Sequence, residues 1–174
     1  MKFLLALLLF PIQVTVSNAQ TIDTVKVFFA MKVDATSFAE AFLKHDYLEY
    51  VRFTYPKIID AAGSKENAIS VLEKGSAKMK SDGLLIDSIF LGKPTSLFTV
   101  ADELQSTIPQ VLFLSKSGLK YRAMSTILSF SQDNGKTWKF VDTKDKEYFE
   151  MKKLIPNLSD KILIHPIKEL QPLK

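Results

Sequence analysis

The spacing of apolar residues changes once along the chain, and this change constrains the fold more than any other feature. Between residues 34 and 82 the apolar side chains recur every three or four positions, which is typical of helices with one buried face. Between residues 84 and 142 they alternate, with short turn sequences in between. Helices followed by strands predict an α+β fold in which the helices pack on one face of an antiparallel sheet.

Capping residues and helix breakers divide the helical region into four predicted helices. The first begins at Ser37, because Ser37 and Glu40 form the capping-box pattern S-x-x-E. The second begins at Asp46, which repeats this capping pattern with a Glu three residues later. A proline at the first helical turn predicts a third helix over residues 56–62. The fourth follows Ser64 and ends near residue 82.

The alternating region predicts a run of strands separated by turns that contain Gly, Pro or Asn. The predicted strands cover residues 84–91, 96–104, 106–115, 119–131 and 137–142. Pro109 cannot donate a backbone hydrogen bond, so we predict that it lies at a sheet edge or a bulge. After the strands, the pattern predicts a short helix over residues 145–154 and a small strand at residues 162–164.

The N-terminal residues have the three parts of a secretory signal peptide. Lys2 precedes an apolar run at residues 3–10, and the small residues at 17–19 provide a cleavage site. A proline and polar residues interrupt the run, so it is shorter than the ~20 apolar residues of a membrane-spanning helix. The sequence therefore predicts a signal peptide at residues 1–19, one domain over residues 20–174, and no membrane span after cleavage.

Cysteine is absent, and the charged residues are dispersed, with 23 Lys and Arg against 19 Asp and Glu. A secreted chain without disulfides fits a bacterial periplasm or the cell exterior. Nucleic-acid binding requires a clustered basic face, and the single basic doublet is formed by Lys152 and Lys153. We therefore predict a secreted or periplasmic bacterial protein with no nucleic-acid partner.

The sequence lacks the motifs that bind common cofactors. Two His and no Cys argue against a transition-metal site. The glycine-rich patterns of nucleotide-binding loops and the G-x-S-x-G pattern of serine hydrolases are missing as well. The sequence therefore predicts neither a metal site nor a cofactor.

Residues 131–138 read S-Q-D-N-G-K-T-W and fit the Asp-box pattern S-x-D-x-G-x-T-W, best known from sialidase-type propellers. Ser131 and Asp133 can accept hydrogen bonds from the N–H groups of the turn, and Gly135 can adopt a positive φ. Trp138 can then bury its ring against the hairpin. A propeller needs several blades, which this chain is too short to contain beside its helical half. We interpret the box as a structural turn.

Three segments carry a resemblance to a known superfamily. They read FAEAFLKHDYLEYV at 38–51, YPKIIDAAGSKENAISVL at 55–72 and LSFSQDNGKTWKFVD at 128–142. In this order they resemble the nuclear transport factor 2-like superfamily, which has a cystatin-like cone, and in particular its uncharacterised secreted bacterial members. The resemblance covers roughly residues 30–142. It implies a curved sheet wrapped around its helices, with an apolar pocket at the open end.

The resemblance also implies candidate ligand-binding and catalytic residues. Its isomerase-type members need a general base and a hydroxyl group in the cone. His45 with Asp46, or else Tyr55, are the candidates for these roles. Successive helical residues point about 100° apart, so His45 and Asp46 pair only if the helix breaks between them. The predicted pocket-lining residues are Phe42, Tyr55, Phe90, Phe98, Phe113, Tyr121 and Trp138.

Three functions follow from these patterns. The leading hypothesis is a secreted, non-enzymatic domain that binds a small amphipathic ligand or a protein partner in the open end of the cone. It rests on the pocket-prone fold, the 13 Phe residues and the lack of a convincing acid–base pair. The alternatives are an isomerase- or dehydratase-type enzyme that uses His45 and Asp46 or a pocket tyrosine, and a structural homodimer that pairs through the sheet face.

Overall fold

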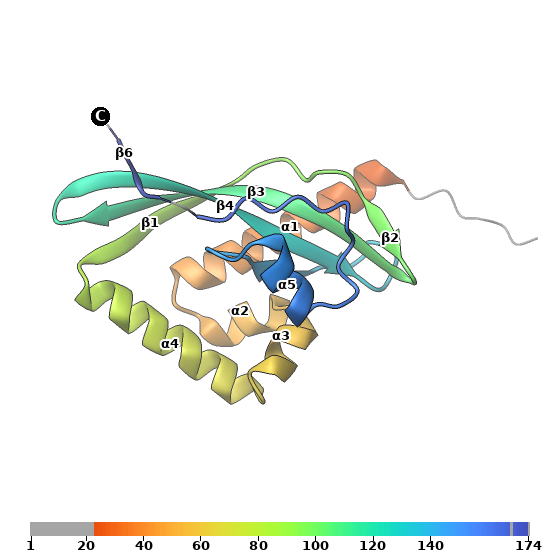
Figure 1. The fold of residues 1–174 in the computed structure, drawn as a ribbon, viewed down its shortest axis with the longest axis horizontal. Helices are drawn as coiled ribbons and strands as arrows, with labels where there is room; N and C mark the ends of the chain where they lie inside the picture. The colour runs from red at the N-terminus through yellow and green to blue at the C-terminus, as the bar shows by residue number, and fades with distance from the viewer. Residues whose placement is uncertain (1–22, 168, 174) are drawn as a thin grey trace, which may run out of the picture.

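The computed structural model describes residues 23–167 and 169–173, so the predicted signal peptide lies outside the described residues. The N-terminal helices pack against a strongly curled antiparallel sheet, which confirms the predicted α+β fold (Figure 1). The helices are α1 (Thr24–Leu43), α2 (Tyr47–Phe53), α3 (Pro56–Ala61), α4 (Lys65–Ser81) and α5 (Tyr148–Leu154). The strands are β1 (Leu84–Leu91), β2 (Phe98–Val100), β3 (Glu103–Lys116), β4 (Leu119–Ser131), β5 (Lys139–Asp142) and β6 (Gln171–Pro172).

A long hairpin formed by β3 and β4 is the centre of the sheet. The strand order is β1-β3-β4-β5, with β2 paired to the start of β3 and β6 paired to β4. The hairpin turns at Ser117 and Gly118, whose φ angles of 51° and 80° suit the tightest two-residue turns. This register places Ile108 opposite Ile127 and Gln110 opposite Ser125. Because side chains alternate along a strand, these four residues share one face of the sheet.

The two faces of the sheet are covered by different parts of the chain. The inner face, which carries Ile108 and Ile127, packs against α1, α2 and α4 around the buried ring of Phe38. The outer face, which carries Leu128 and Phe130, packs against α5 and the chain that follows it. A third apolar cluster continues along the inner face beyond the helices; its members are Leu112, Leu114 and Ala123, with Leu84, Ile86, Ile89, Tyr121, Ile167 and Leu170 packed against them.

The prediction that the first helix begins at Ser37 was wrong. The helix α1 begins at Thr24, after Asp23, whose side chain accepts a hydrogen bond from the N–H of Lys26 at 3.3 Å. Ser37 lies inside the helix, and its hydroxyl donates to the carbonyl of Val33. The pattern S-x-x-E therefore occurs here without capping a helix. Buried residues at helical spacing precede it: Val27, Met31 and Ala35.

Pro109 lies in β3 and pairs with Thr126 of β4 on one side. On its other side β1 has already ended, because the last β1 pair joins Leu91 to Gln110, and β2 pairs only with residues 103–105, so the predicted edge position applies to this side of Pro109. Its carbonyl accepts from the N–H of Gly92 at 2.8 Å, one residue past the end of β1. The N and O of one strand residue face the same neighbour, so the missing N–H of Pro109 also faces this strand end. There the Nζ of Lys32 on α1 donates to the carbonyls of Leu91 and Gly92, at 2.8 Å and 2.9 Å. Lys32 of α1 therefore provides hydrogen bonds to the two carbonyls at the end of β1, where the chain leaves the sheet.

The chain after β5 contains less regular structure than its pattern predicts. The predicted strand at residues 162–164 was wrong, because Ile162 is buried in the outer-face cluster without strand pairing. The nearby N–H of His165 donates to the side-chain hydroxyl of Thr126 at 2.9 Å instead of to a strand carbonyl. The predicted strand at residues 96–104 shortens to β2, and the predicted helix at residues 145–154 shortens to α5.

Candidate functional site

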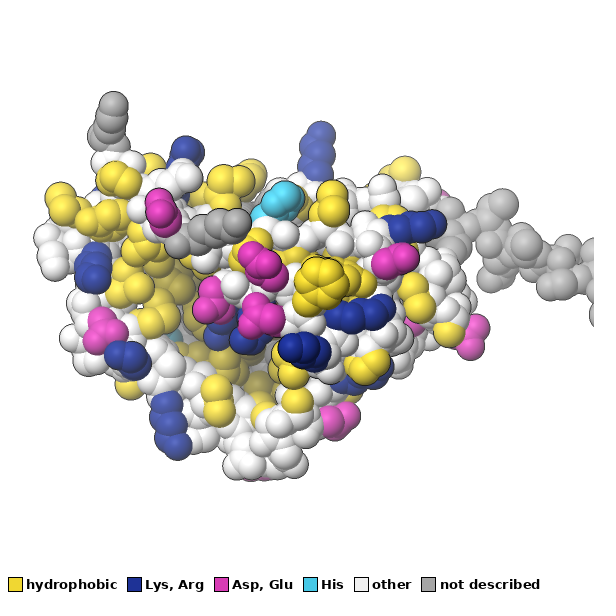
Figure 2. Space-filling model, in the orientation of Figure 1, with side chains coloured by type: hydrophobic (Ala, Val, Ile, Leu, Met, Phe, Trp, Pro, Cys, Tyr) yellow, Lys and Arg dark blue, Asp and Glu magenta, His cyan; other side chains and the backbone are white. Residues whose placement is uncertain are grey.

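The helix α4 covers part of the inner face and leaves space beneath it. Ser64 caps its first turn by accepting from the N–H of Asn67 at 3.1 Å, and Ala68 is the single buried residue among its 17. Figure 2 shows that the molecule is hollowed where Figure 1 places α4 opposite the sheet, and that hydrophobic side chains line much of the visible hollow. Two pockets lie along this helix, one at each half. We call them the larger pocket and the smaller pocket.

The larger pocket has a volume of 390 Å³ and lies between the end of α1, the second half of α4 and the start of β1. Apolar side chains form much of its wall, including Phe42, Met79, Leu84 and Ile86. The same pocket also has polar side chains, which come from the α1–α2 connection and from α4. It therefore combines an apolar wall with a few hydrogen-bonding groups, as small-molecule sites do.

His45 is the polar residue at the centre of this group. It lies between α1 and α2 with a φ of 57°, which turns the chain sharply from one helix into the next. Its Nδ1 is 2.8 Å from the hydroxyl of Tyr47 and 3.3 Å from the hydroxyl of Ser76. When Nδ1 accepts from Tyr47, the ring proton lies on Nε2, which is then able to donate to a ligand. His45 thus joins the α1–α2 connection to α4 at the larger pocket.

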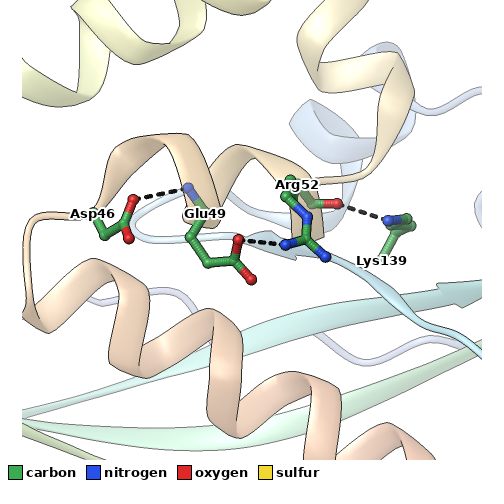
Figure 3. A network of polar contacts seen from close by, with 4 residues as sticks. All are labelled: Asp46, Glu49, Arg52 and Lys139. Atoms are coloured by element: carbon green, nitrogen blue, oxygen red, sulfur yellow. Dashed lines mark hydrogen bonds and ion pairs between the residues drawn. The ribbon is translucent and has the colours of Figure 1, made fainter.

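Asp46 is turned toward the helix that it caps rather than toward His45. Its carboxylate accepts from the N–H of Glu49 at 3.0 Å, and Glu49 in turn binds the guanidinium of Arg52 at 2.7 Å (Figure 3). The carbonyl of Arg52 accepts from Lys139 on β5. Among the hydrogen bonds of the described residues, none joins His45 to Asp46. The structure therefore brings Tyr47 and Ser76, not the predicted carboxylate, to the imidazole.

Tyr55 belongs to a buried polar network at the outer face, and not to the pockets beneath α4. Its hydroxyl donates to Glu103 at 2.9 Å, and its ring stacks on Phe130 with 4.0 Å between centroids. Burial and the hydrogen bond to Glu103 raise the pKa of the Tyr55 hydroxyl well above its ordinary value. The two carboxylate oxygens of Glu103 also accept from three side-chain amides, those of Gln105, Gln132 and Asn157. Glu103 is thus satisfied by four neutral donors.

The seven predicted pocket residues do not line one common pocket among the described residues. Phe42 lines the larger pocket, while Trp138 is wholly buried in the core. Phe90 is 63% exposed, and the alternation along β1 and β3 places it with Phe113 on the outer face. Phe98 packs against the outer-face cluster and Tyr121 against the third cluster. Strand register therefore separates aromatic residues that the sequence grouped together.

The Asp-box residues make a turn that is bound to α1. Ser131 accepts from the N–H of Gly135 at 2.9 Å, and Asp133 accepts from the N–H and the hydroxyl of Thr137 at 3.0 Å and 2.7 Å. The indole of Trp138 donates to the carbonyl of Gly135, and its backbone N–H donates to Asp34 on α1 at 2.8 Å. The side chains of Ser131, Asp133 and Thr137 are thus engaged in holding the turn together.

The smaller pocket was not predicted. It has a volume of 180 Å³, lies under the first half of α4, and has apolar walls that include Val51 and Leu72. Tyr50 and Asp142 lie at its surface. Burial raises the pKa of the Asp142 carboxyl, although the backbone N–H and the charge of Lys144, and then the amide of Gln110, oppose the shift. Burial, and then the charge of Asp142, raise the pKa of the Tyr50 hydroxyl.

The strand register brings two polar side chains of β3 and β4 to Asp142 at the smaller pocket. Gln110 lies opposite Ser125, while Asp142 on the next strand lies opposite Ile127. The amide of Gln110 donates to Ser125 at 2.7 Å and to Asp142 at 3.0 Å. The alternation along each strand shows which of its residues share a face. Only the pairing of the strands shows that these polar groups meet.

Three further observations, on membrane spans, metal-binding groups and similarity to known proteins, assign no function to the chain. Within the described part of the chain, no helix has the length and apolar character needed to cross a membrane. The same residues contain no group of three or more His, Asp or Glu placed to hold a metal ion. No protein-family model matches the chain, and neither the curated proteins nor the solved structures gave a match.

Proposed function

We propose that this chain is a binding module that takes a small amphipathic ligand into the larger pocket beneath α4. The observation that carries the proposal is the 390 Å³ pocket with an apolar wall and the polar group of His45, Tyr47 and Ser76. Its volume lies within the range of about 300–1,000 Å³ that small-molecule sites occupy. Its apolar wall suits the hydrocarbon part of a ligand. The His45 ring and the ammonium of Lys80 suit a head group that accepts hydrogen bonds.

The proposal includes the superfamily and the location that the sequence predicts. The order of helices and strands and the strong curl of the sheet support membership of the nuclear transport factor 2-like superfamily. The signal-peptide pattern at residues 1–19 supports export to the periplasm or the exterior. An exported binding module would meet its ligand outside the cytoplasm.

Octanoate is a suitable probe for this pocket, because it combines a short apolar chain with one carboxylate. We expect octanoate to shift the NMR signals of His45, Met79 and Ile86. Replacing Ala77, an exposed residue at the pocket, by Trp should block the pocket and abolish these shifts. Lys74→Trp, on the same helix outside the pocket, is the matched control and should bind normally. Undiminished octanoate binding by Ala77→Trp would rule the proposal out.

A second candidate function is a homodimer formed through the outer face. The register aligns Phe90, Val111 and Met124 across three strands on that face, and Phe90 and Met124 are 63% and 54% exposed. Large exposed apolar side chains that adjoin one another are typical of interaction surfaces. Sedimentation should show a dimer that Phe90→Glu dissociates, while Phe149→Glu, at an exposed site on α5, leaves it intact. A monomer at all concentrations would exclude this candidate.

A further inference from the structure

We propose that the smaller pocket is a second binding site, which takes a compact neutral molecule with one aromatic-ring-sized apolar body and one hydroxyl group. The hydroxyl would donate to Asp142 and accept from Tyr50. This proposal does not depend on the function proposed for the larger pocket, because the two pockets share no lining residue. It concerns groups that the sequence analysis did not single out.

The size and walls of the smaller pocket define the body of the ligand. An apolar cavity of about 150 Å³ is large enough to bind benzene, and this pocket has 180 Å³. Its apolar wall comes from three helices and from β5, and includes Val51, Ile59, Leu72 and Phe140. A ring-sized apolar molecule fits these dimensions, whereas a long lipid chain does not.

Two hydrogen-bonding groups at the pocket define the polar part of the ligand. Both hydrogen bonds that Asp142 accepts go to Oδ1, one from Gln110 and one from the N–H of Lys144, each at 3.0 Å. Tyr50 is only 8% exposed. Among the hydrogen bonds of the described residues, none involves Oδ2 of Asp142 or the hydroxyl of Tyr50. Neither atom is among the buried side-chain atoms of the described residues that lack a partner, so both reach solvent at the pocket, where a ligand can take the place of water as their partner. A ligand hydroxyl has both a donor and an acceptor to offer to these two residues, which line the same pocket.

The charges around the smaller pocket favour a neutral ligand. Asp142 repels an anion, and it takes part in no ion pair among those of the described residues. Lys144 also lies at the pocket and repels a cation. Burial raises the pKa of Asp142 and that of Tyr50, which shows that the surroundings disfavour charge. A hydroxyl compound that stays neutral therefore fits better than a carboxylate or an amine.

Benzyl alcohol and ethylbenzene provide a direct test, because they match in size and differ by a hydroxyl in place of a methyl group. We expect both to shift the NMR methyl signals of Val51 and Leu72. Benzyl alcohol should bind about tenfold more tightly, as expected for the hydrogen bonds that its hydroxyl adds. Equal affinities, or no shift with either compound, would overturn the proposal.

Variants of the two polar residues locate the hydroxyl. Tyr50→Phe and Asp142→Asn should each weaken benzyl alcohol binding by about three- to tenfold and leave ethylbenzene binding within about twofold. Tyr47→Phe, which removes a hydroxyl from the same helix at the larger pocket, and Asp145→Asn, at an exposed position, are the matched controls. An equal loss in Tyr47→Phe would place the ligand elsewhere and refute the assignment. If Tyr50→Phe fails to fold, two measurements still test the proposal. One is benzyl alcohol binding by Asp142→Asn, and the other is the ratio of the benzyl alcohol and ethylbenzene affinities of the natural chain.

Discussion

At the scale of single residues, Asp142 shows how this fold tolerates a carboxylate in partly apolar surroundings. Three neutral groups lie around it: the amide of Gln110, the backbone N–H of Lys144 and, at the same pocket, the phenol of Tyr50. None of these three groups carries a charge, and the ammonium of Lys144 offsets only part of the cost of desolvating the carboxylate. The raised pKa of Asp142 reflects this cost.

Asp142→Asn should stabilise the protein at neutral pH, because the amide keeps an oxygen that accepts from Gln110 and removes a charge that the surroundings disfavour. The pKa of Asp142 is higher in the folded state, so its protonated form favours folding and this contribution is lost as the pH rises through the folded-state pKa. Below the unfolded-state pKa of about 3.9 the advantage of the variant should vanish. Urea unfolding between pH 3 and pH 8 measures it, with Asp145→Asn as the control. An advantage that does not change with pH would contradict this explanation.

At the scale of secondary-structure elements, the junction between β1 and β3 depends on a helix. The strand β1 ends at Leu91, and the next residue, Gly92, faces Pro109, which has no N–H to offer; the ammonium of Lys32 on α1 donates to the carbonyls of Leu91 and Gly92 instead. Desolvation lowers the pKa of Lys32, as expected for an ammonium group drawn toward the protein interior. The helix layer thus takes part in the hydrogen bonding of the sheet, in addition to packing on its inner face.

Lys32→Met should lower the free energy of unfolding by about 1–3 kcal/mol, because two partly buried carbonyls lose a charged donor while the apolar stem is kept. Chemical denaturation measures the loss, and amide hydrogen exchange should show faster exchange at the end of β1. Lys74→Met, on the exposed side of α4, is the control for loss of a surface charge. A variant as stable as the natural chain would show that water replaces the ammonium at no cost.

At the scale of the whole molecule, Glu103 joins segments that are far apart in the chain. Its carboxylate accepts from Tyr55 before α3, from Gln132 after β4 and from Asn157 after α5. Gln105 completes the network, and its side-chain oxygen accepts from the N–H of Ser159 at 2.8 Å. The C-terminal part of the chain is therefore attached to the outer face by buried hydrogen bonds as well as by apolar packing.

Glu103→Ala should destabilise the protein by about 3 kcal/mol, because four donors, two of them on the buried residues Tyr55 and Gln105, lose their acceptor at once. Glu103→Gln should cost less, since one oxygen remains to accept. Limited proteolysis should cut Glu103→Ala first in the chain after α5. Thermal unfolding compares the two variants with Glu73→Ala, an exposed site on α4. Equal midpoints for all three would mean that the network adds nothing to stability.

The sequence by itself determined the elements whose signals are local. The alternation over β1 and β4 and the turn at Ser117 and Gly118 depend on neighbouring residues only, and they were predicted with their observed bounds. Local signals fail where one pattern suits two environments. The pattern at Ser37 reads as a helix start, although buried residues one and two turns earlier extend the same helix.

Only the tertiary structure decided where the pockets lie. Tyr50 and Asp142 are 92 residues apart in number, and they meet because β5 pairs with β4 while α2 packs on the same face. A shift of one residue in that pairing would move Asp142 to the outer face. Strand register and helix packing are set by contacts between distant segments, and these contacts leave no trace in the local spacing of residues. For this reason the α+β class followed from the sequence, while the smaller pocket and the polar groups at its surface did not.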